Sequence, residues 1–359
     1  MPSGLSERGE PIETTPTPGP TTFALVGCGR VASHHLRALE SHADRASLIA
    51  VCDTDAERLS EASRQASVPG YESLEVLLAN EEPEVIVLAS PSGLHPRQAT
   101  MAARAGCHVM CEKPIATDLQ EGRRVVEACE EAGIELFVVK QLRYNPTLRL
   151  LARALTEGRF GAIHMVDLDV FWTRPQAYYD RDAWRGSRRL DGGALLNQTS
   201  HYVDLLTWLF GAVDSVQAYT DTLARDIEVE DSAVVNLRWR SGTLGSMSVT
   251  MLTWPENLRA SLTVIGSRGT AVLGGKACDK IETWRFRGES EDAHHIARVN
   301  ERTREFYGDG HINYYENVLD VLQNGHTADT DGHEGLKSLE VISAAYRSDA
   351  TGNRVELPL

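Results

Sequence analysis

The stretch "TFALVGCGRVASHHLRALE" at residues 22–40 decides the fold of the first part of this chain. Its opening residues, 22–27, are a short apolar run, which predicts a buried strand, and residues 28–42 have helical spacing. Gly27, Gly29 and Ala32 fall between them in the pattern G-x-G-x-x-A. In that pattern the first glycine permits a tight turn, the second lets a pyrophosphate approach the backbone, and the small third residue lets helix pack on strand. The stretch therefore predicts a dinucleotide-binding turn, with phosphate at the helix N-terminus beside Arg30 and Val31.

The same alternation continues along the next hundred residues. Further apolar runs stand at 47–53, 84–90, 108–114 and 134–141, with helical segments between them. Alternating apolar strands and helices predict a parallel sheet that is covered on both faces. We therefore expect an α/β Rossmann domain over residues 21–142.

Asp53 ends the second apolar run, 24 residues after Gly29 (53 − 29). An acid at this spacing accepts hydrogen bonds from the adenosine ribose and repels a 2′-phosphate. Thr54 and Asp55 follow, with no arginine to neutralise such a phosphate. The sequence therefore favours NAD over NADP.

Residues 143–359 follow a different pattern and predict an α+β domain with a large, mostly antiparallel sheet. Period-two alternation, clearest at 234–240, marks strands at 162–172, 215–224, 232–240, 242–252, 258–266, 269–275 and 281–288. Helices are expected at 192–211, 314–325 and 335–348, and loops over 298–313. One face of such a sheet packs on a core, and the other needs a cover.

Composition narrows the classes of function. The 359 residues carry a net charge of −15, which disfavours nucleic acid, and no run of 18 apolar residues predicts a membrane span. Residues 1–20 contain five prolines and no apolar block, so we expect a disordered tail rather than a signal peptide, and a cytoplasmic protein. The six cysteines are expected to be reduced, and the pair Cys107 and Cys111 is not expected to bind a metal.

Two further stretches carry residues of chemical interest. In "CEKPIA" (111–116), Lys113 is either a charge at a strand end or a group that handles a proton. In 192–211, Asn197, His201 and Asp204 are spaced i, i+4 and i+7, which places them on one face of an otherwise apolar helix. Polar groups on such a face need partners, which are either protein groups or a ligand.

Five motifs occur in the order found in the Gfo/Idh/MocA oxidoreductases, which the chain resembles from residue 21 onward. They are "GCGRVA" (27–32), "SPSGLHP" (90–96), "CEKPIA" (111–116), "WRG" (184–186) and "GG…NQTSHYVD" (192–204). Further stretches, such as "RYNPTL" and "LLNQTSHYVDLL", resemble the UDP-N-acetyl-2-amino-2-deoxy-D-glucuronate 3-dehydrogenases of that family. Those enzymes oxidise the sugar 3-hydroxyl on the route to diacetamido uronic acids of bacterial surface polysaccharides.

The resemblance implies roles for matching positions. Lys113 and His201 would flank the reacting carbinol, with His201 as base and Lys113 orienting the hydroxyl; the opposite assignment stays open. Arg174, Tyr179 and Asn197 would line the substrate pocket, with Arg174 on an anionic group. The cofactor would be contacted by Gly27, Gly29, Arg30, Val31, Asp53, Ser90, Ser92, His95, Glu112, Lys113, Gln141, Trp184 and Arg185. The family also implies a homotetramer that is built on the open sheet face.

Position 197 departs from the family pattern, because many members carry aspartate four residues before the histidine. Here the residue is Asn197. We hypothesise that a neutral side chain suits an anionic substrate, since a carboxylate would repel a uronate.

Two alternatives stay open from the sequence. One is an NAD-dependent dehydrogenase of another nucleotide sugar, a free sugar or an inositol, because the same machinery would serve all of these. The other is a non-catalytic dinucleotide-binding regulator, which would keep the glycine turn and Asp53 but need not retain both Lys113 and His201.

Overall fold

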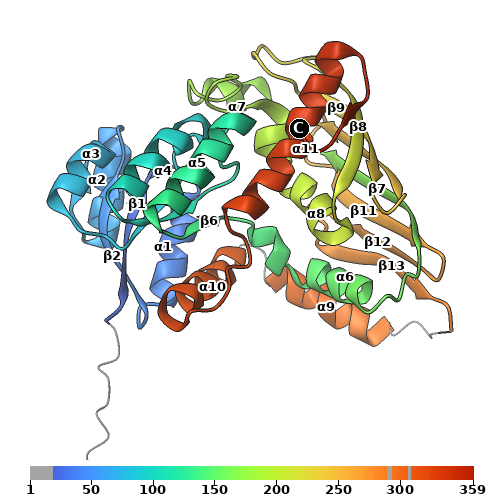
Figure 1. Ribbon diagram of the computed structural model, residues 1–359, viewed down its shortest axis with the longest axis horizontal. Coiled ribbons are helices and arrows are strands. Elements are labelled where there is room, and N and C mark those ends of the chain that lie inside the picture. The colour runs from blue at the N-terminus through green and yellow to red at the C-terminus, as the bar shows by residue number, and fades with distance from the viewer. Residues whose placement is uncertain (1–18, 289–292, 306–308) are drawn as a thin grey trace, which may run out of the picture.

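The computed structural model describes residues 19–288, 293–305 and 309–359. The first half of the chain forms a parallel sheet flanked by helices, and the second half forms a broad sheet that carries helices on one side (Figure 1). The fold class expected from the sequence, a Rossmann domain followed by a domain with a mostly antiparallel sheet, is confirmed.

The first sheet, called sheet A, has six parallel strands in the order β3-β2-β1-β4-β5-β6. This order places the carboxyl ends of β1 and β4 side by side at the point where the chain reverses direction across the sheet, which is where such folds bind ligands. The strands are β1 (Thr21–Val26), β2 (Ala46–Cys52), β3 (Gly70–Tyr71), β4 (Val85–Leu88), β5 (His108–Cys111) and β6 (Leu136–Val138).

Side-chain acceptors start several of the helices that cover sheet A. Asp55, Ser73 and Asp118 each accept hydrogen bonds from backbone N–H groups of the first turn that follows. The helices are α1 (Ala32–Ser41), α2 (Ala56–Ala66), α3 (Leu74–Asn80), η1 (Ser92–Leu94), α4 (His95–Arg104) and α5 (Leu119–Ala132).

Both faces of sheet A are buried, because alternate residues of its strands point into separate cores. Phe23 and Leu25 of β1 pack in a core with Tyr314 and Tyr315, whereas Ala24 of the same strand belongs to the other core. Tyr314 and Tyr315 come from α10 (Gly310–Asn324), so a helix from the end of the chain closes the core of the first sheet beside α1 (Figure 1).

The second sheet, called sheet B, has eight strands in the order β13-β12-β11-β7-β10-β9-β8-β14. All neighbouring pairs are antiparallel except β7 and β10, which are parallel. The strands are β7 (Ile163–Phe171), β8 (Val213–Asp221), β9 (Ser232–Trp239), β10 (Leu244–Thr250), β11 (Arg259–Gly266), β12 (Gly269–Gly274), β13 (Lys280–Phe286) and β14 (Val355–Glu356).

The helices of the second half gather on the side of sheet B that faces the first half (Figure 1). The long helix α11 packs against β8, α8 and α5, and so joins the two halves. These helices are η2 (Gln141–Tyr144), α6 (Pro146–Thr156), α7 (Gln176–Asp180), the π-helix η3 (Ala194–Gln198), α8 (Ser200–Phe210), α9 (Ala293–Glu305) and α11 (Gly332–Thr351).

Three local expectations were wrong or incomplete. Residues 298–305, expected to be loop, belong to α9, which packs on α6 and β13. The helix expected over 192–211 is broken at Thr199 into η3 and α8. The two-residue strands β3 and β14 carry no periodicity and were not predicted. The domain boundary at residue 142 stays a prediction.

All six cysteines are free thiols, as the sequence predicted. Within the described ranges, no helix combines the length and apolar character needed to cross a membrane.

Candidate functional site

The turn between β1 and α1 has the geometry that the glycine pattern predicted. Gly27 has φ of +97°, and a Cβ there would lie 2.6 Å from the backbone of Ala89 and Ser90, which follow β4. A Cβ at Gly29 would meet nothing within 4 Å, so the backbone is open on that side. Helix α1 begins without a side-chain cap, which leaves first-turn N–H groups for an anion, beside Arg30 and Val31.

Asp53 stands directly after β2, with its carboxylate turned toward this turn. One oxygen accepts the Cys28 N–H at 2.7 Å and the other accepts the Asp55 N–H at 2.8 Å, so the carboxylate is held in place before any ligand arrives. A hollow of about 740 Å³ is lined by Cys28, Gly29 and Arg58, among others. The open backbone, the uncapped helix and the fixed carboxylate together fit a dinucleotide.

Arg58 is a residue near Asp53 that the sequence reasoning missed. It lies in the first turn of α2 and donates a 2.6 Å hydrogen bond to Asp182, which belongs to the second half of the chain. It also approaches Asp55 at 3.6 Å. Because two carboxylates hold this guanidinium, the expectation of NAD over NADP does not change.

Ser90, Ser92 and His95 follow β4: Ser90 lies on the loop, Ser92 begins η1 and His95 begins α4. The Ser90 hydroxyl contacts Gln98 at 2.5 Å, and Ser92 is buried in η1. The ring nitrogens of His95 lie 2.8 and 2.9 Å from the carbonyl oxygens of Pro114 and Ser90. His95 therefore ties the ends of β4 and β5 together, and any effect on the cofactor would act through those two backbones.

Glu112, the residue after β5, is buried between two histidines. His311 Nε2 lies 3.0 Å and His35 Nε2 3.2 Å from the same carboxylate oxygen, and the other oxygen accepts the Lys113 N–H at 3.2 Å. Burial alone would raise the pKa of Glu112, but the hydrogen bonds from His311 and His35 hold it well below the usual range. These three side chains also form a group that could hold a metal, since one ligand atom from each lies within 4.8 Å of the others.

Lys113 reaches from the end of β5 to the second half of the chain. Its Nζ donates a 2.7 Å hydrogen bond to the backbone carbonyl of Asn197 in η3. Burial lowers the pKa of Lys113, while the negative charges of Glu112 and Asp191 oppose that effect. The lysine therefore lies where the two halves of the chain contact each other rather than in solvent.

His201 lies in the first turn of α8, within the electrostatic reach of Lys113. Burial lowers its pKa well below the usual value, and the positive charge of Lys113 lowers it further. Its Nδ1 is buried and has no hydrogen-bond partner among the described residues. Lys113 and His201 therefore lie within electrostatic range of each other, and both burial and the lysine charge favour the neutral imidazole.

Asp191 and Asn197 form a contact that the sequence did not predict. The Asn197 side-chain amide donates to Asp191 Oδ1, and the Gly186 N–H donates to Asp191 Oδ2 at 2.6 Å. Asn197, His201 and Asp204 therefore do not act as one face: the Asn197 side chain turns to Asp191, while Asp204 pairs with Arg143. The only signal in the sequence was the acid directly before the two glycines at 192–193.

Arg174 lies in the segment after β7, half-buried between the rings of Trp172 and Tyr178. Its guanidinium donates to Gln198 at 2.9 Å and to the Thr173 carbonyl at 2.7 Å. Within the described chain no carboxylate pairs with it, and burial lowers its pKa. An arginine with only neutral partners can still accept an anionic ligand.

Tyr179 is buried edge-on against Tyr178, with ring centroids 5.1 Å apart. Burial raises the pKa of Tyr179, so its hydroxyl stays protonated. Tyr178, which the sequence analysis did not name, is better placed for polar contacts. Its hydroxyl oxygen accepts hydrogen bonds from the Arg185 guanidinium at 2.5 Å and from the Gln198 amide at 3.0 Å.

Arg185, Trp184 and Gln141 are the remaining residues that the sequence analysis expected at the cofactor. The Arg185 guanidinium stacks on Trp184 at 4.5 Å and donates to Asp182 at 2.9 Å, which links it to Arg58. Gln141, in η2 after β6, has a buried side-chain oxygen without a partner among the described residues. A buried amide oxygen of this kind is free to accept a ligand hydrogen bond.

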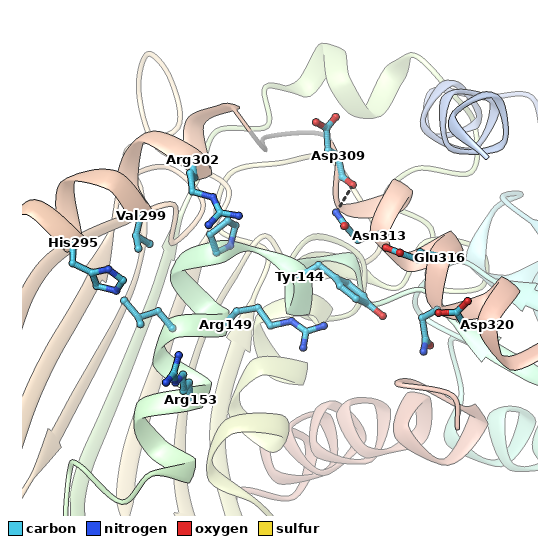
Figure 2. A pocket seen from close by; sticks show the side chains of 13 residues that line it. Tyr144, Arg149, Arg153, His295, Val299, Arg302, Asp309, Asn313, Glu316 and Asp320 are labelled. Atoms are coloured by element: carbon cyan, nitrogen blue, oxygen red, sulfur yellow. Dashed lines mark hydrogen bonds between the residues drawn. The ribbon is translucent and has the colours of Figure 1, made fainter. Parts of the chain in front are cut away.

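A separate pocket of about 770 Å³ lies between α6, α9 and α10 (Figure 2). Arg149, Arg153 and Arg302 come from one side, and Asp309, Glu316 and Asp320 from the other. No residue of the sites described above lines it. The pocket therefore takes no part in the assignment of function.

Comparison with known proteins places both halves of the chain in one family. Residues 21–140 match the model described as "Oxidoreductase family, NAD-binding Rossmann fold". Residues 152–357 match "Oxidoreductase family, C-terminal alpha/beta domain". The two matches follow the two sheets of the structure.

Two solved structures are similar over nearly the whole chain. The WlbA dehydrogenase from Bordetella pertussis, in complex with NADH and UDP-GlcNAcA, is 50% identical, with a TM-score of 0.93 over 96% of this chain and 99% of that one. The WlbA dehydrogenase from Chromobacterium violaceum, with the same ligands, is 51% identical, with a TM-score of 0.91 over 96% and 97%. A curated relative, D-apiose dehydrogenase from Paraburkholderia graminis, is 27% identical over 93% of this chain and 89% of its own length.

Proposed function

The chain belongs to the Gfo/Idh/MocA oxidoreductase family, with an NAD-binding Rossmann domain, and from this we propose that it oxidises the C3 hydroxyl of UDP-N-acetylglucosaminuronic acid to the 3-keto sugar. The observation that carries the proposal is that Lys113, from the first half of the chain, hydrogen-bonds the Asn197 carbonyl in the second half and its charge acts on the buried His201. The two solved relatives at 50% and 51% identity, both bound to NADH and UDP-GlcNAcA, support the substrate.

His201 is the proposed base. Burial and the neighbouring lysine keep its imidazole neutral at physiological pH, so it can accept a proton. Lys113, held by the Asn197 carbonyl, donates a hydrogen bond that orients the substrate hydroxyl and shares in the proton relay. Bound NAD supplies the hydride acceptor for this chemistry.

The two assignments of base differ in pH dependence. With His201 as base, kcat/KM rises at a pH below 6.5, the ordinary histidine value from which the pKa of His201 is lowered. The same kcat/KM falls at alkaline pH, when Lys113 loses its proton. This fall is expected below pH 10.5, the ordinary lysine value, because burial lowers the pKa of Lys113. With Lys113 as base, the rise itself would follow the lysine pKa, so a rise well above pH 6.5 would reverse the roles.

The substrate pocket is proposed to include Arg174, Tyr179 and Asn197. Arg174 would hold an anionic group of the nucleotide sugar, since its present partners are neutral. The neutral Asn197 also avoids placing a further carboxylate beside Asp191 and the anionic sugar. Arg174→Ala is therefore expected to raise KM more than it lowers kcat.

The dinucleotide is proposed to be held by the residues that the sequence named. Gly27, Gly29, Arg30 and Val31 would surround the pyrophosphate, and Asp53 the adenosine ribose. The nicotinamide end would lie among Ser90, Ser92, His95, Glu112, Lys113, Gln141, Trp184 and Arg185. The open backbone at Gly29 and the free side-chain oxygen of Gln141 support this placement.

The test follows NADH formation with four substrates under one set of conditions. UDP-N-acetylglucosaminuronic acid is expected to exceed UDP-glucuronic acid, UDP-N-acetylglucosamine and myo-inositol in kcat/KM. Deuterium placed at C3 of the sugar should be recovered in NADH, which locates the oxidised carbon. A preference for another nucleotide sugar, or for an inositol, would replace the substrate while leaving the family chemistry in place. No turnover of any of them would favour a dinucleotide-binding regulator.

A homotetramer through sheet B is part of the proposal. The face of sheet B away from the helices exposes apolar side chains on neighbouring strands, and the register places Met165 of β7 beside Leu244 of β10 and Ile265 of β11. Such a patch marks an interaction surface. Light scattering should give four chains for the wild type and fewer for Leu244→Glu. The cytoplasmic location and a role in surface polysaccharide synthesis stay predictions.

A further inference from the structure

Asp191 is a buried acid next to the proposed site to which neither the sequence nor the comparisons assign a role. It is 1% exposed and lies on the loop before η3. Its two oxygens accept hydrogen bonds from the Gly186 N–H and from the Asn197 side-chain amide. A buried carboxylate needs donors such as these, and one of them belongs to the residue that holds Lys113.

Asn197 connects Asp191 to Lys113 through two hydrogen bonds. While its side chain is bound to Asp191, its backbone carbonyl accepts the Lys113 Nζ at 2.7 Å. That carbonyl lies in the last turn of η3, where the helix ends at Thr199 and carbonyl groups lack regular partners within the helix. Fixing the Asn197 side chain therefore also fixes the acceptor of the lysine.

Asp191 also acts on Lys113 through charge. The negative charges of Glu112 and Asp191 raise the pKa of Lys113 against the effect of burial, while Lys140 and Arg30 lower it. The effect is mutual, since burial raises the pKa of Asp191 and the nearby Arg185 and Lys113 oppose this. Removing the Asp191 charge should thus make the Lys113 ammonium easier to deprotonate.

We propose that Asp191 is a positioning residue for Lys113, acting through Asn197: its carboxylate fixes the Asn197 amide, and the Asn197 carbonyl in turn holds the lysine amine. The proposal rests on the catalytic role of Lys113 in the proposed function. It gives a second reason for asparagine at 197, because an aspartate there would face the Asp191 carboxylate. The simpler alternative is that Asp191 only anchors the loop from Gly186 to η3.

An exchange of the two side chains separates these readings. Asp191→Asn leaves two amides in contact, Asn197→Asp leaves two carboxylates, and the double variant restores one of each. Each single variant is expected to lose about 10- to 100-fold in kcat, and the double variant to recover at least about 10-fold relative to the product of the two losses. Losses that simply multiply would show that the pair does not act as a unit, and would overturn the proposal.

A second readout needs no substrate and so stands apart from the proposed function. The chain has five lysines, and the rate at which acetic anhydride labels Lys113 can be followed against pH by mass spectrometry, with the exposed Lys280 as internal reference. In Asp191→Asn the labelling midpoint of Lys113 is expected to fall by about one pH unit. Asn197→Ala, which keeps the Asp191 charge, should leave the midpoint closer to that of the wild type while still lowering kcat.

Asp180→Asn is the matched control, because Asp180 is an exposed acid on α7 that contacts only Gln176 in the described structure. It should change neither the Lys113 midpoint nor kcat. If Lys113 in the Asp191→Asn protein is labelled with the same pH midpoint as in the wild type, the electrostatic part of the proposal is wrong. This holds even if the wild type turns over none of the four substrates. A wild type without turnover but with the shifted midpoint in Asp191→Asn would instead reject the proposed function alone.

Discussion

Two groups of polar side chains each include residues from the segment 191–210, and they differ in how completely they are paired. The Asp204 cluster consists of Lys140, Arg143, Asp204 and Glu334, and the Lys113 site consists of Lys113, Asp191, Asn197 and His201. In the first, Arg143 makes two hydrogen bonds of 2.8 Å to Asp204 and one of 2.9 Å to Glu334. In the second, Lys113 donates to a neutral carbonyl, and His201 Nδ1 has no partner among the described residues.

We infer from this difference that the Asp204 cluster stabilises the fold and that the Lys113 site is completed by a ligand. Burial alone would raise the pKa of Asp204, but Lys140 and Arg143 lower it, so the acid is ionised and its charge is neutralised. A buried group without a partner costs free energy, and a substrate can offset that cost by completing the contacts. We expect substitutions in the Asp204 cluster to reduce stability, and substitutions in the Lys113 site to reduce activity.

The largest expected effect tests the activity half of this comparison. The double variant Lys113→Met/His201→Gln removes both proposed proton-handling groups. Its kcat should fall by about 10⁴-fold, the upper range for general acid–base catalysis. Its urea midpoint should equal or exceed that of the wild type, because a buried cation without a carboxylate partner has been removed. A large loss of stability with kcat retained would reverse the comparison.

Asp204→Asn tests the stability half. Removing one partner of a buried ion pair leaves Lys140 and part of Arg143 uncompensated, which should cost about 4 kcal/mol in urea unfolding. Glu130→Gln is the control, since its contact with His333 is exposed and should contribute less than about 1 kcal/mol. Equal losses of unfolding free energy in the two variants would mean that burial does not determine how much these ion pairs contribute to stability.

Local signals explain why the first half of the fold could be predicted. Each strand of sheet A except β3 is an apolar run, and the glycine turn and Asp53 lie within one βαβ unit. Helix α9 was missed because most of its residues are polar; among its described side chains, Ile296 and Val299 are the hydrophobic ones that pack on the core. Its helical state therefore depends on tertiary contacts with α6 and β13 rather than on a pattern in the sequence.

The candidate site was predictable only where motifs carried it. Lys113 and His201 were singled out from their local patterns, and the resemblance gave them their roles; those roles stay predictions. The i, i+4 spacing of Asn197 and His201 misled, because the π-helix turns the Asn197 side chain toward Asp191. Glu230 could not be predicted, since its partners Leu195 and Tyr346 come from distant parts of the chain. The partners of Asp191 are close in sequence, but the loop geometry that brings Gly186 and Asn197 to its carboxylate has no periodic pattern.

Glu230 offers a smaller test, because it is a buried acid beside η3 with only neutral partners. The Leu195 N–H and the Tyr346 hydroxyl donate to the same oxygen of Glu230. Burial raises its pKa to about 7, above the value of about 4.3 for an unfolded glutamate. Between these two values the folded protein keeps a proton that the unfolded chain has released, so stability falls as pH rises.

Glu230→Gln should remove this pH dependence, since glutamine stays neutral throughout. Relative to the variant, the wild type should lose roughly 1.4 kcal/mol per pH unit across that window, or about 4 kcal/mol in all, and level off above it. Urea unfolding at several pH values measures the difference. A difference that is flat across the window, or that grows in the opposite direction, would mean that Glu230 is ionised in the folded protein.

The smallest expected effect comes from Asp182, which forms ion pairs with Arg58 of α2 and with Arg185 of the second half of the chain. The hydrogen bond from Arg58 is the main reason that the pKa of Asp182 is lowered, but the Arg58 side chain is 44% exposed and has Asp55 as a second partner. Asp182→Asn should therefore cost at most about 1 kcal/mol, and less at high salt. Calorimetric titration with NAD should show only a few-fold weaker binding. This contact joins α2 to the second half of the chain. A loss of stability near that of Asp204→Asn would mean that an exposed ion pair between the two halves contributes as much stability as a buried one. The contrast drawn between the Asp204 cluster and the Lys113 site would then be wrong.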